Sequence, residues 1–322
     1  MNFLSWIIFV PLQILFIPIT ILGVLLVGYR QIAVSKRLGL SLTAIEVINA
    51  RWTMHVFGMR DDEPTARLAA ALPNTSLIGL WLCLFPLWLK AKISGRIALY
   101  PRKPDPGSET LADLIVVRTL YFDRLIERLS GTVEQVVIMG AGYDTRAYGG
   151  LRGRSLGLFE LDQSNVQDHK RETLKKAGID TGHMNFVSVD FETESFMQRL
   201  VESGFDVSKK TLFLWEGVTL YLSETDVRMT LRDIRDTVTA GSVILADVYA
   251  ERLIDYGGKG WRKSTLDLTG ENVKFGLNFT MNHEEVLSKF VQSESMDVGE
   301  CYFMGTKNDR GPFMVVVEMK ID

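Results

Sequence analysis

Cysteine and histidine are scarce in this chain, and neither residue is clustered. The 322 residues include only Cys83 and Cys301, too few for a disulfide framework and without the close spacing of a metal site. The four histidines are scattered, with no pair at the H-x-x-x-H spacing of a zinc site: His55, His169, His183 and His283. The sequence therefore predicts neither a disulfide-stabilised fold nor a metal centre.

Excess charge is also lacking. The formal net charge is −3 and the sequence pI is about 5.9, so there is no basic surface of the kind that nucleic acid requires. A hydrophobic content of 47% with 23% charged residues is typical of a folded protein, and the length suits one large α/β domain with appendages. We expect no nucleic-acid partner.

Charged residues are absent from residues 3–28, a run of 26 positions. About 20 apolar residues suffice to cross a bilayer, so this run predicts a transmembrane helix. Pro11 and Pro18 would either kink that helix or make the segment re-entrant or interfacial, and these alternatives stay open. A cleaved signal peptide is disfavoured because the run is too long and no basic region precedes it.

The basic residues that follow this run are Arg30, Lys36 and Arg37. By the positive-inside rule they keep the C-terminal side of the run in the cytoplasm. We therefore expect a membrane anchor over residues 1–30. A helical cap would follow over residues 31–109, and a cytoplasmic catalytic domain over residues 110–322.

A second apolar block covers residues 77–89 and includes Trp81 and Trp88. Its 13 positions are too few to span a membrane. Lys90 and Lys92 follow it, and tryptophan beside lysine is typical of an interfacial helix. A buried helix of the cap accounts for the same pattern equally well. Within the cap, acids and a proline at residues 61–64 predict a helix start.

The clearest functional signal is a glycine turn after a short apolar run. Residues 136–139 are mostly β-branched, as in a buried parallel strand, and Gly140, Ala141 and Gly142 follow directly. Glycine there lets the backbone bend and approach a ligand closely. A helix is expected to begin near Thr145.

Two acids follow the next apolar run, which covers residues 156–159. The first, Glu160, lies 160 − 140 = 20 residues after Gly140, the spacing of a ribose-binding carboxylate, and Asp162 follows it. The third glycine of the dinucleotide motif is absent, and Asp144 puts a negative charge where a pyrophosphate would lie. S-adenosylmethionine carries no phosphate, so the residues favour this methyl donor over a nicotinamide cofactor. A plain strand-to-helix turn stays a third interpretation.

Motifs on either side of the turn resemble the leucine carboxyl methyltransferase family, which includes the protein phosphatase methyltransferases and many bacterial O-methyltransferases. They occur in the family's order at residues 117–123, 139–146, 159–163, 189–191 and 214–222. The resemblance implies a class I methyltransferase fold, which is a Rossmann-like, doubly wound α/β sheet of seven strands, with S-adenosylmethionine as cofactor. The apolar runs agree with this fold, because they predict strands near residues 136, 157, 186, 212 and 243, followed by a hairpin over 299–319.

The resemblance also implies roles for individual residues. Arg118 would pair with the carboxylate of the methionine moiety, above a floor formed by Gly140 and its neighbours. Glu216 would lie near the methionine ammonium, although it could also be a strand-end acid facing water. Asp162 would accept hydrogen bonds from the ribose hydroxyls, with Glu160 behind it or sharing this task.

Asp190 and Phe191 would border the adenine, the acid near its amino group and the ring as an apolar face. The N-terminal basic residue with which the phosphatase methyltransferases reach the cofactor has no secure counterpart before Arg51. From the residues alone, Arg118 and Asp123 fit an ordinary exposed helix pair as well.

The sequence thus predicts an S-adenosylmethionine-dependent O-methyltransferase acting on a carboxylate or hydroxyl of a hydrophobic small molecule or lipid at the membrane. No catalytic residue is assigned, because a carboxylate acceptor needs no base and the candidates for a hydroxyl acceptor, Tyr221 and His283, suit packing better. Residues 249–279 have the irregular composition of a lid over the substrate. The alternatives are a protein-carboxylate methyltransferase, a membrane-anchored NAD(P)-dependent oxidoreductase and a non-catalytic adaptor.

Overall fold

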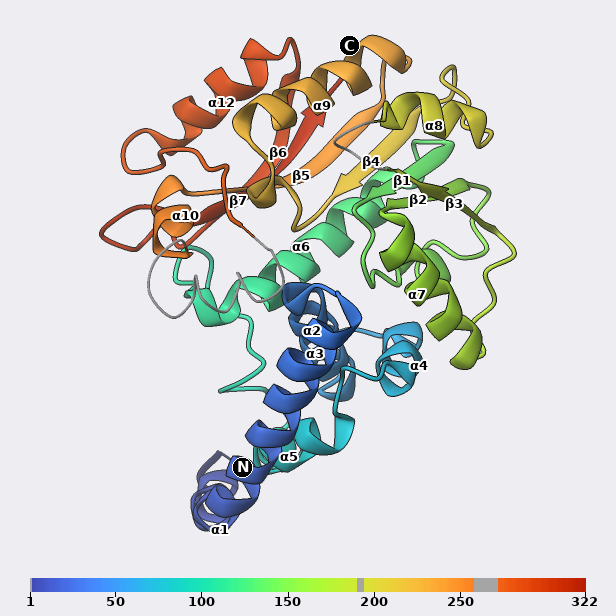
Figure 1. Cartoon of the computed structure of the whole chain (residues 1–322). Helices are drawn as coiled ribbons and strands as arrows, with labels where there is room; N and C mark the ends of the chain where they lie inside the picture. The colour runs from blue at the N-terminus through green and yellow to red at the C-terminus, as the bar shows by residue number, and fades with distance from the viewer. Residues whose placement is uncertain (1, 190–193, 258–271) are drawn as a thin grey trace.

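The centre of the molecule is a seven-stranded sheet (Figure 1). The computed structural model describes residues 2–189, 194–257 and 272–322, and the strands lie in the order β3-β2-β1-β4-β5-β7-β6. Strands β1 to β5 run parallel, and β7 runs antiparallel to β5 and β6. This order, with its final antiparallel hairpin, confirms the predicted fold class. The strands are β1 (Gln135–Met139), β2 (Gly157–Asp162), β3 (Met184–Ser188), β4 (Thr211–Trp215), β5 (Val243–Tyr249), β6 (Asp297–Met304) and β7 (Met314–Lys320).

Helices cover both faces of the sheet. On one face α6, α7 and the cap helices pack against residues such as Val136, and on the other α8, α9 and α12 pack against its neighbour Val137. Side chains alternate along a strand, so adjacent residues enter opposite cores. The helices of this domain are α6 (Leu114–Leu129), α7 (Ser164–Lys176), α8 (Phe196–Glu202), α9 (Glu224–Thr237), α10 (Glu251–Gly257) and α12 (His283–Ser293), with short 3-10 turns η2 (Leu111–Asp113) and η4 (Thr219–Tyr221).

The connection from β1 to β2 differs from the prediction. Instead of an α-helix near Thr145, the chain forms only a 3-10 turn, η3 (Arg146–Tyr148). Gly149 and Gly150 follow it, and glycine disfavours continuation of a helix. All three residues of η3 are buried, so this turn holds the Arg146 side chain in the interior.

The cap helices begin at side-chain caps. Ser41 Oγ accepts from the Ala44 amide at 3.0 Å at the start of α3, and Asp62 Oδ1 accepts from the Thr65 amide at 3.1 Å at the start of α4. The predicted helix start at residues 61–64 is therefore confirmed. The N-terminal elements are α1 (Asn2–Gly28), a π-helical turn η1 (Tyr29–Val34), α2 (Ser35–Leu38), α3 (Leu42–Val56), α4 (Glu63–Ala71) and α5 (Leu77–Ser94).

Helices α1 and α5 pack together at the end of the molecule away from the sheet (Figure 1). A Cβ on Gly23 would lie 2.7 Å from the Gly79 carbonyl oxygen, so the two backbones approach closely because both residues are small. Toward the other end of the pair, the Lys90 ammonium lies 4.4 Å from the centre of the Trp6 ring. These contacts run in opposite order along the two helices, which are therefore antiparallel.

The α1–α5 pair has an unusually apolar surface. Phe3 is 79% exposed and Leu15 is 71% exposed on α1. Two helices, residues 3–38 and Leu77–Ser94, are long and apolar enough to cross a membrane by length and composition. The helix that contains the second apolar block is longer than the 13 positions counted from the sequence, because it continues past Lys90 and ends only at Gly95, where φ is +68°.

Candidate functional site

The glycine turn after β1 has the backbone that only glycine adopts readily. Gly140 has φ +60° and Gly142 has φ +42°. A Cβ on Gly140 would lie 2.6 Å from Cγ2 of Val218, so a side chain there would collide with the segment after β4. The Ala141 amide donates to the Leu161 carbonyl at 3.0 Å, which joins the turn to the end of β2.

Of the two predicted ribose acids, Asp162 lies at the turn. Its Oδ2 accepts from the Gly142 amide at 2.6 Å, its Oδ1 accepts from the Gln163 amide at 2.8 Å, and burial raises its pKa. Glu160 is fully buried instead and accepts from Lys170 Nζ at 2.9 Å. Burial raises the pKa of Glu160 to about 6 against the opposing effect of Lys170. Asp162 is therefore the acid at the edge of the sheet, and Glu160 belongs to an internal ion pair.

Arg118 and Glu216 meet directly. Arg118 on α6 is 4% exposed and donates from Nε to Glu216 Oε1 at 3.1 Å. Its Nη1 donates to Asp247 at 3.1 Å and to the Tyr249 hydroxyl at 2.6 Å. The alternatives of an exposed Arg118–Asp123 pair and of a solvated Glu216 are therefore wrong.

Two further arginines converge on Glu216, whose side chain is only 6% exposed. Its Oε2 accepts from Arg51 Nη2 at 3.0 Å and from Arg146 Nη1 at 2.6 Å. Burial opposes the charge, but Arg146, Arg51 and Arg118 together lower the pKa of Glu216 to about 2. Glu216 is thus held ionised among three guanidinium groups.

Asp144 completes this arginine–carboxylate cluster. It accepts from Arg51 Nη1 at 2.8 Å, and from the backbone and Nη1 of Arg146 at 2.8 and 2.5 Å. Arg146 also donates to Asp123 at 2.7 Å. Although burial opposes it, Arg146 and Arg51 hold the pKa of Asp144 well below its ordinary value. We define the cluster by six residues: Arg51, Arg118, Asp144, Arg146, Glu216 and Asp247.

The sequence analysis missed three members of this cluster. Arg51 comes from α3 in the cap and donates to both Asp144 and Glu216. Arg146 ends the motif over residues 139–146. Asp247 interrupts the apolar run of β5 and is fully buried. A charged residue inside an apolar segment is costly unless paired, and this signal marks both Arg51 and Asp247.

Several predicted residues lie elsewhere. Asp190 and Phe191 fall outside the described residues, as does the middle of the predicted lid. The two described ends of that lid meet in a bridge between Ala250 and Leu277. The Tyr221 hydroxyl donates to Thr43 at 2.9 Å, and His283 packs its ring 4.5 Å from that of Phe303. Neither candidate base is therefore bonded to the cluster through these contacts.

Known proteins resemble part of this chain. A family model described as leucine carboxyl methyltransferase matches residues 87–235. A putative S-adenosyl-L-methionine-dependent methyltransferase of Mycobacterium avium is 28% identical over 176 residues, which cover 52% of this chain and 58% of the relative. Another from Mycolicibacterium paratuberculosis is 39% identical over 132 residues, which cover 40% of this chain and 44% of the relative. The chain thus matches about half the length of these curated relatives.

Solved structures show only distant likeness. An O-methyltransferase family protein from Burkholderia thailandensis is 12% identical with a TM-score of 0.42, over 65% of this chain and 58% of that one. Magnesium protoporphyrin IX methyltransferase from Synechocystis PCC 6803, with bound SAH, is 9% identical with a TM-score of 0.44, over 68% of this chain and 90% of that one. The fold assignment rests on the strand order. Over residues 87–235, a segment that contains Arg118, the glycine turn and Glu216, the chain is similar to the leucine carboxyl methyltransferase family, and its curated relatives are S-adenosyl-L-methionine-dependent methyltransferases.

Proposed function

We propose that this chain is a membrane-attached, S-adenosylmethionine-dependent O-methyltransferase whose acceptor is an apolar small molecule or lipid carrying a hydroxyl or a carboxylate. The observation that carries the proposal is the hydrogen bond of 2.6 Å between the Gly142 amide and Asp162, at the same sheet edge as the arginine–carboxylate cluster. Ligands of open α/β sheets bind at this edge, beyond the carboxyl ends of the strands.

The residues present fit the cofactor. Arg51 Nε and Arg146 Nη2 are buried and have no hydrogen-bond partner among the described residues. A buried donor without a partner costs about 1–3 kcal/mol, and a ligand carboxylate would satisfy both. We therefore add Arg51 and Arg146 to Arg118 as groups that would hold the methionine carboxylate.

The remaining contacts follow from the charges of the site. Glu216 would attract the methionine ammonium, and Asp162 would accept from the ribose hydroxyls. Asp190 and Phe191 stay predicted adenine neighbours on the family resemblance, and Gly140 to Gly142 would form the floor.

The bound cofactor would supply an electrophilic methyl group on a sulfonium. The protein's task is to exclude water and to align the acceptor oxygen, and such alignment contributes about 7–11 kcal/mol. Glu216 and Asp144 have lowered pKa values, so both stay ionised at neutral pH and act as fixed charges rather than proton donors. A carboxylate acceptor needs no base.

The α1–α5 pair supports attachment to the membrane from one side. Both ends of α5 are tied to the rest of the protein: the Asn74 amide donates to Ser35 Oγ at 3.0 Å before it, and Glu109 accepts from the Gly305 amide at 2.8 Å after it. If α5 crossed the bilayer, residues 95–109 would have to recross it without helical structure.

That segment carries five charged residues: Arg96, Arg102, Lys103, Asp105 and Glu109. Lipid excludes both irregular backbone and unpaired charge. We therefore propose that α5, and α1 beside it, lie within one leaflet, which modifies the predicted transmembrane helix. The catalytic domain would remain on the cytoplasmic side.

Calorimetric titration of the purified full-length protein tests the function. It should bind S-adenosylmethionine and S-adenosylhomocysteine but not NAD. Asp162→Ala should weaken binding by about 1.5–3 kcal/mol, the range for hydrogen bonds to charged groups. Asp206→Ala serves as the control, because the Asp206 carboxylate is 45% exposed and accepts from the neighbouring Ser208 hydroxyl. Binding of NAD would favour the oxidoreductase, and an unchanged affinity would remove Asp162 from the site.

A further inference from the structure

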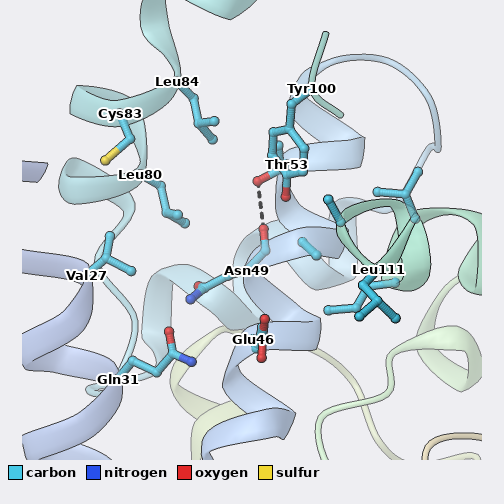
Figure 2. Close-up of a pocket in the computed structure, with 14 residues that line it drawn as sticks. Val27, Gln31, Glu46, Asn49, Thr53, Leu80, Cys83, Leu84, Tyr100 and Leu111 are labelled. Carbon is cyan, nitrogen blue, oxygen red and sulfur yellow. Dashed lines mark hydrogen bonds between the residues drawn. The ribbon is translucent and has the colours of Figure 1, made fainter. Parts of the chain in front are cut away.

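A cavity of about 350 Å³ lies between the α1–α5 pair and the cap (Figure 2). Pockets for small ligands begin at about 300 Å³, so this volume suits a small molecule. Nine of its 14 lining residues precede residue 87, outside the segment that the family model matches. The cavity is therefore built largely from the part of this chain that the family match does not cover.

The cavity has one apolar wall and one polar wall. Leu80 and Leu84 of α5 form the first with Val27 of α1, and Asn49 and Thr53 of α3 form the second (Figure 2). A molecule held here would thus place a hydrocarbon portion against α5 and a polar group against α3.

In the polar wall, the side-chain oxygen of Asn49 lacks a hydrogen-bond partner among the residues that the structure describes. Asn49 is 7% exposed, and this oxygen, Oδ1, is buried. Thr53 beside it donates its hydroxyl proton to the Asn49 backbone carbonyl at 2.8 Å, so that proton is already used. A buried acceptor without a donor is unfavourable, and a ligand that donates a hydrogen bond would satisfy it.

Charge in the cavity disfavours an acidic ligand. The described lining residues include one acid, Glu46, and no basic residue. Burial and the Glu46 carboxylate raise the pKa of Tyr100, which keeps its hydroxyl neutral. A ligand carboxylate would enter beside Glu46 without a counter-charge, at a cost in desolvation and repulsion. Because Glu46 is exposed to solvent, its attraction for a ligand ammonium is screened.

We propose that this cavity binds an apolar alcohol drawn from the bilayer, with its hydroxyl donating to Asn49 Oδ1 and its chain lying against Leu80 and Leu84. The helix α3 separates this site from the arginine–carboxylate cluster, since Asn49 faces the cavity while Arg51 bonds Asp144. Binding here does not require methyl transfer, so it goes beyond the proposed reaction, and only the supply of the alcohol from the bilayer rests on the proposed membrane attachment.

Photolabelling of the full-length protein in phosphatidylcholine vesicles tests this site. The probe is hexadecanol carrying a diazirine, competed with unlabelled hexadecanol, hexadecanoic acid or hexadecylamine. We expect labelled peptides from α3 or α5. Unlabelled alcohol should compete at concentrations about tenfold lower than the acid or the amine, because the alcohol gains a hydrogen bond whereas the other two bring an unpaired charge into the cavity. Equal competition by the acid or the amine would overturn the proposal.

Variants separate the cavity from the lipid surface. Leu84→Trp should fill the cavity and abolish labelling. Ile78 lies on the same helix but is 73% exposed, so Ile78→Trp should leave labelling unchanged. Asn49→Leu should remove most of the preference for the alcohol. Calorimetry with S-adenosylmethionine checks that each variant is folded and reports the proposed function separately. Labelling that persists in Leu84→Trp while the variant binds the cofactor would contradict the cavity as the site.

Discussion

The α1–α5 pair and the arginine–carboxylate cluster distribute polarity in opposite ways. The helix pair turns apolar side chains outward, with Phe3 79% exposed, whereas the cluster turns charges inward, with Arg118 4% exposed. Each arrangement is unfavourable for an isolated protein in water. The proposed membrane attachment would give the exposed apolar side chains of the helix pair an apolar environment, and pairing with a counter-charge or a ligand offsets the cost of each buried charge in the cluster.

The two regions also differ in how they are held. Close contact between small residues, Gly23 and Gly79, joins the helices. In the cluster, the single carboxylate of Glu216 connects three elements, because it accepts hydrogen bonds from Arg51 of α3, Arg118 of α6 and Arg146 of η3. Removal of the apolar helix α1 should therefore alter the association of the protein with membranes. Removal of one charge from the cluster should lower both the stability of the fold and the affinity for the cofactor.

The largest expected effect is on location. A chain beginning at Ser41 lacks the 26 uncharged positions, so it should no longer resist carbonate extraction from membranes, while still binding S-adenosylmethionine. Residual binding to vesicles that Trp81→Ala with Trp88→Ala abolishes would assign an interfacial role to α5. Sedimentation measures both. Carbonate resistance equal to that of the full-length protein would contradict the role given to α1.

Loss of the Glu216 charge should have the next largest effect. Glu216→Gln removes the negative charge that faces three buried guanidinium groups. Breaking such a buried ion-pair network lowers the free energy of unfolding by about 3–5 kcal/mol. The control is Glu202→Gln, whose carboxylate forms an exposed ion pair with Arg199 and should change stability by less than about 1 kcal/mol. Denaturant unfolding in detergent measures both.

The same variant has a predicted pH dependence. The pKa of Glu216 is lowered from 4.5 to about 2 on folding, so its contribution is fully present above pH 4.5 and is lost as the pH falls toward 2. The difference between wild type and Glu216→Gln should therefore shrink over this window. A difference that is constant from pH 7 to pH 3 would show that packing, rather than charge, explains the loss.

A smaller effect is expected in the glycine turn. Gly140→Ala places a Cβ at positive φ and 2.6 Å from Val218, which should cost about 1–3 kcal/mol and weaken cofactor binding. Gly142→Ala also has positive φ, but its Cβ would meet only ordinary contacts at 3.9 Å, so its loss should be smaller. Val218→Ala should partly rescue Gly140→Ala. Equal losses in the two glycine variants, without rescue, would exclude the collision.

The sequence predicted the sheet better than the site. Each strand is a local apolar run, so its position can be recognised without knowledge of the fold, and the final hairpin has its own turn residues. The arginine–carboxylate cluster depends on residues far apart, since Arg51 and Glu216 are 165 positions from each other. Such a contact follows only from the packing of the cap on the sheet. The α-helix predicted near Thr145 does not form, because Gly149 and Gly150 follow the buried 3-10 turn that contains Arg146.

The most direct test of the central claim is methyl transfer from radiolabelled S-adenosylmethionine, by the full-length protein, into material extracted from membranes. A membrane-attached methyltransferase of apolar acceptors should transfer label to a product that partitions into the organic phase, and its turnover should increase when vesicles are added to the detergent-free chain beginning at Ser41. Label that appears only in a water-soluble or protein product, with turnover indifferent to vesicles, would contradict the account.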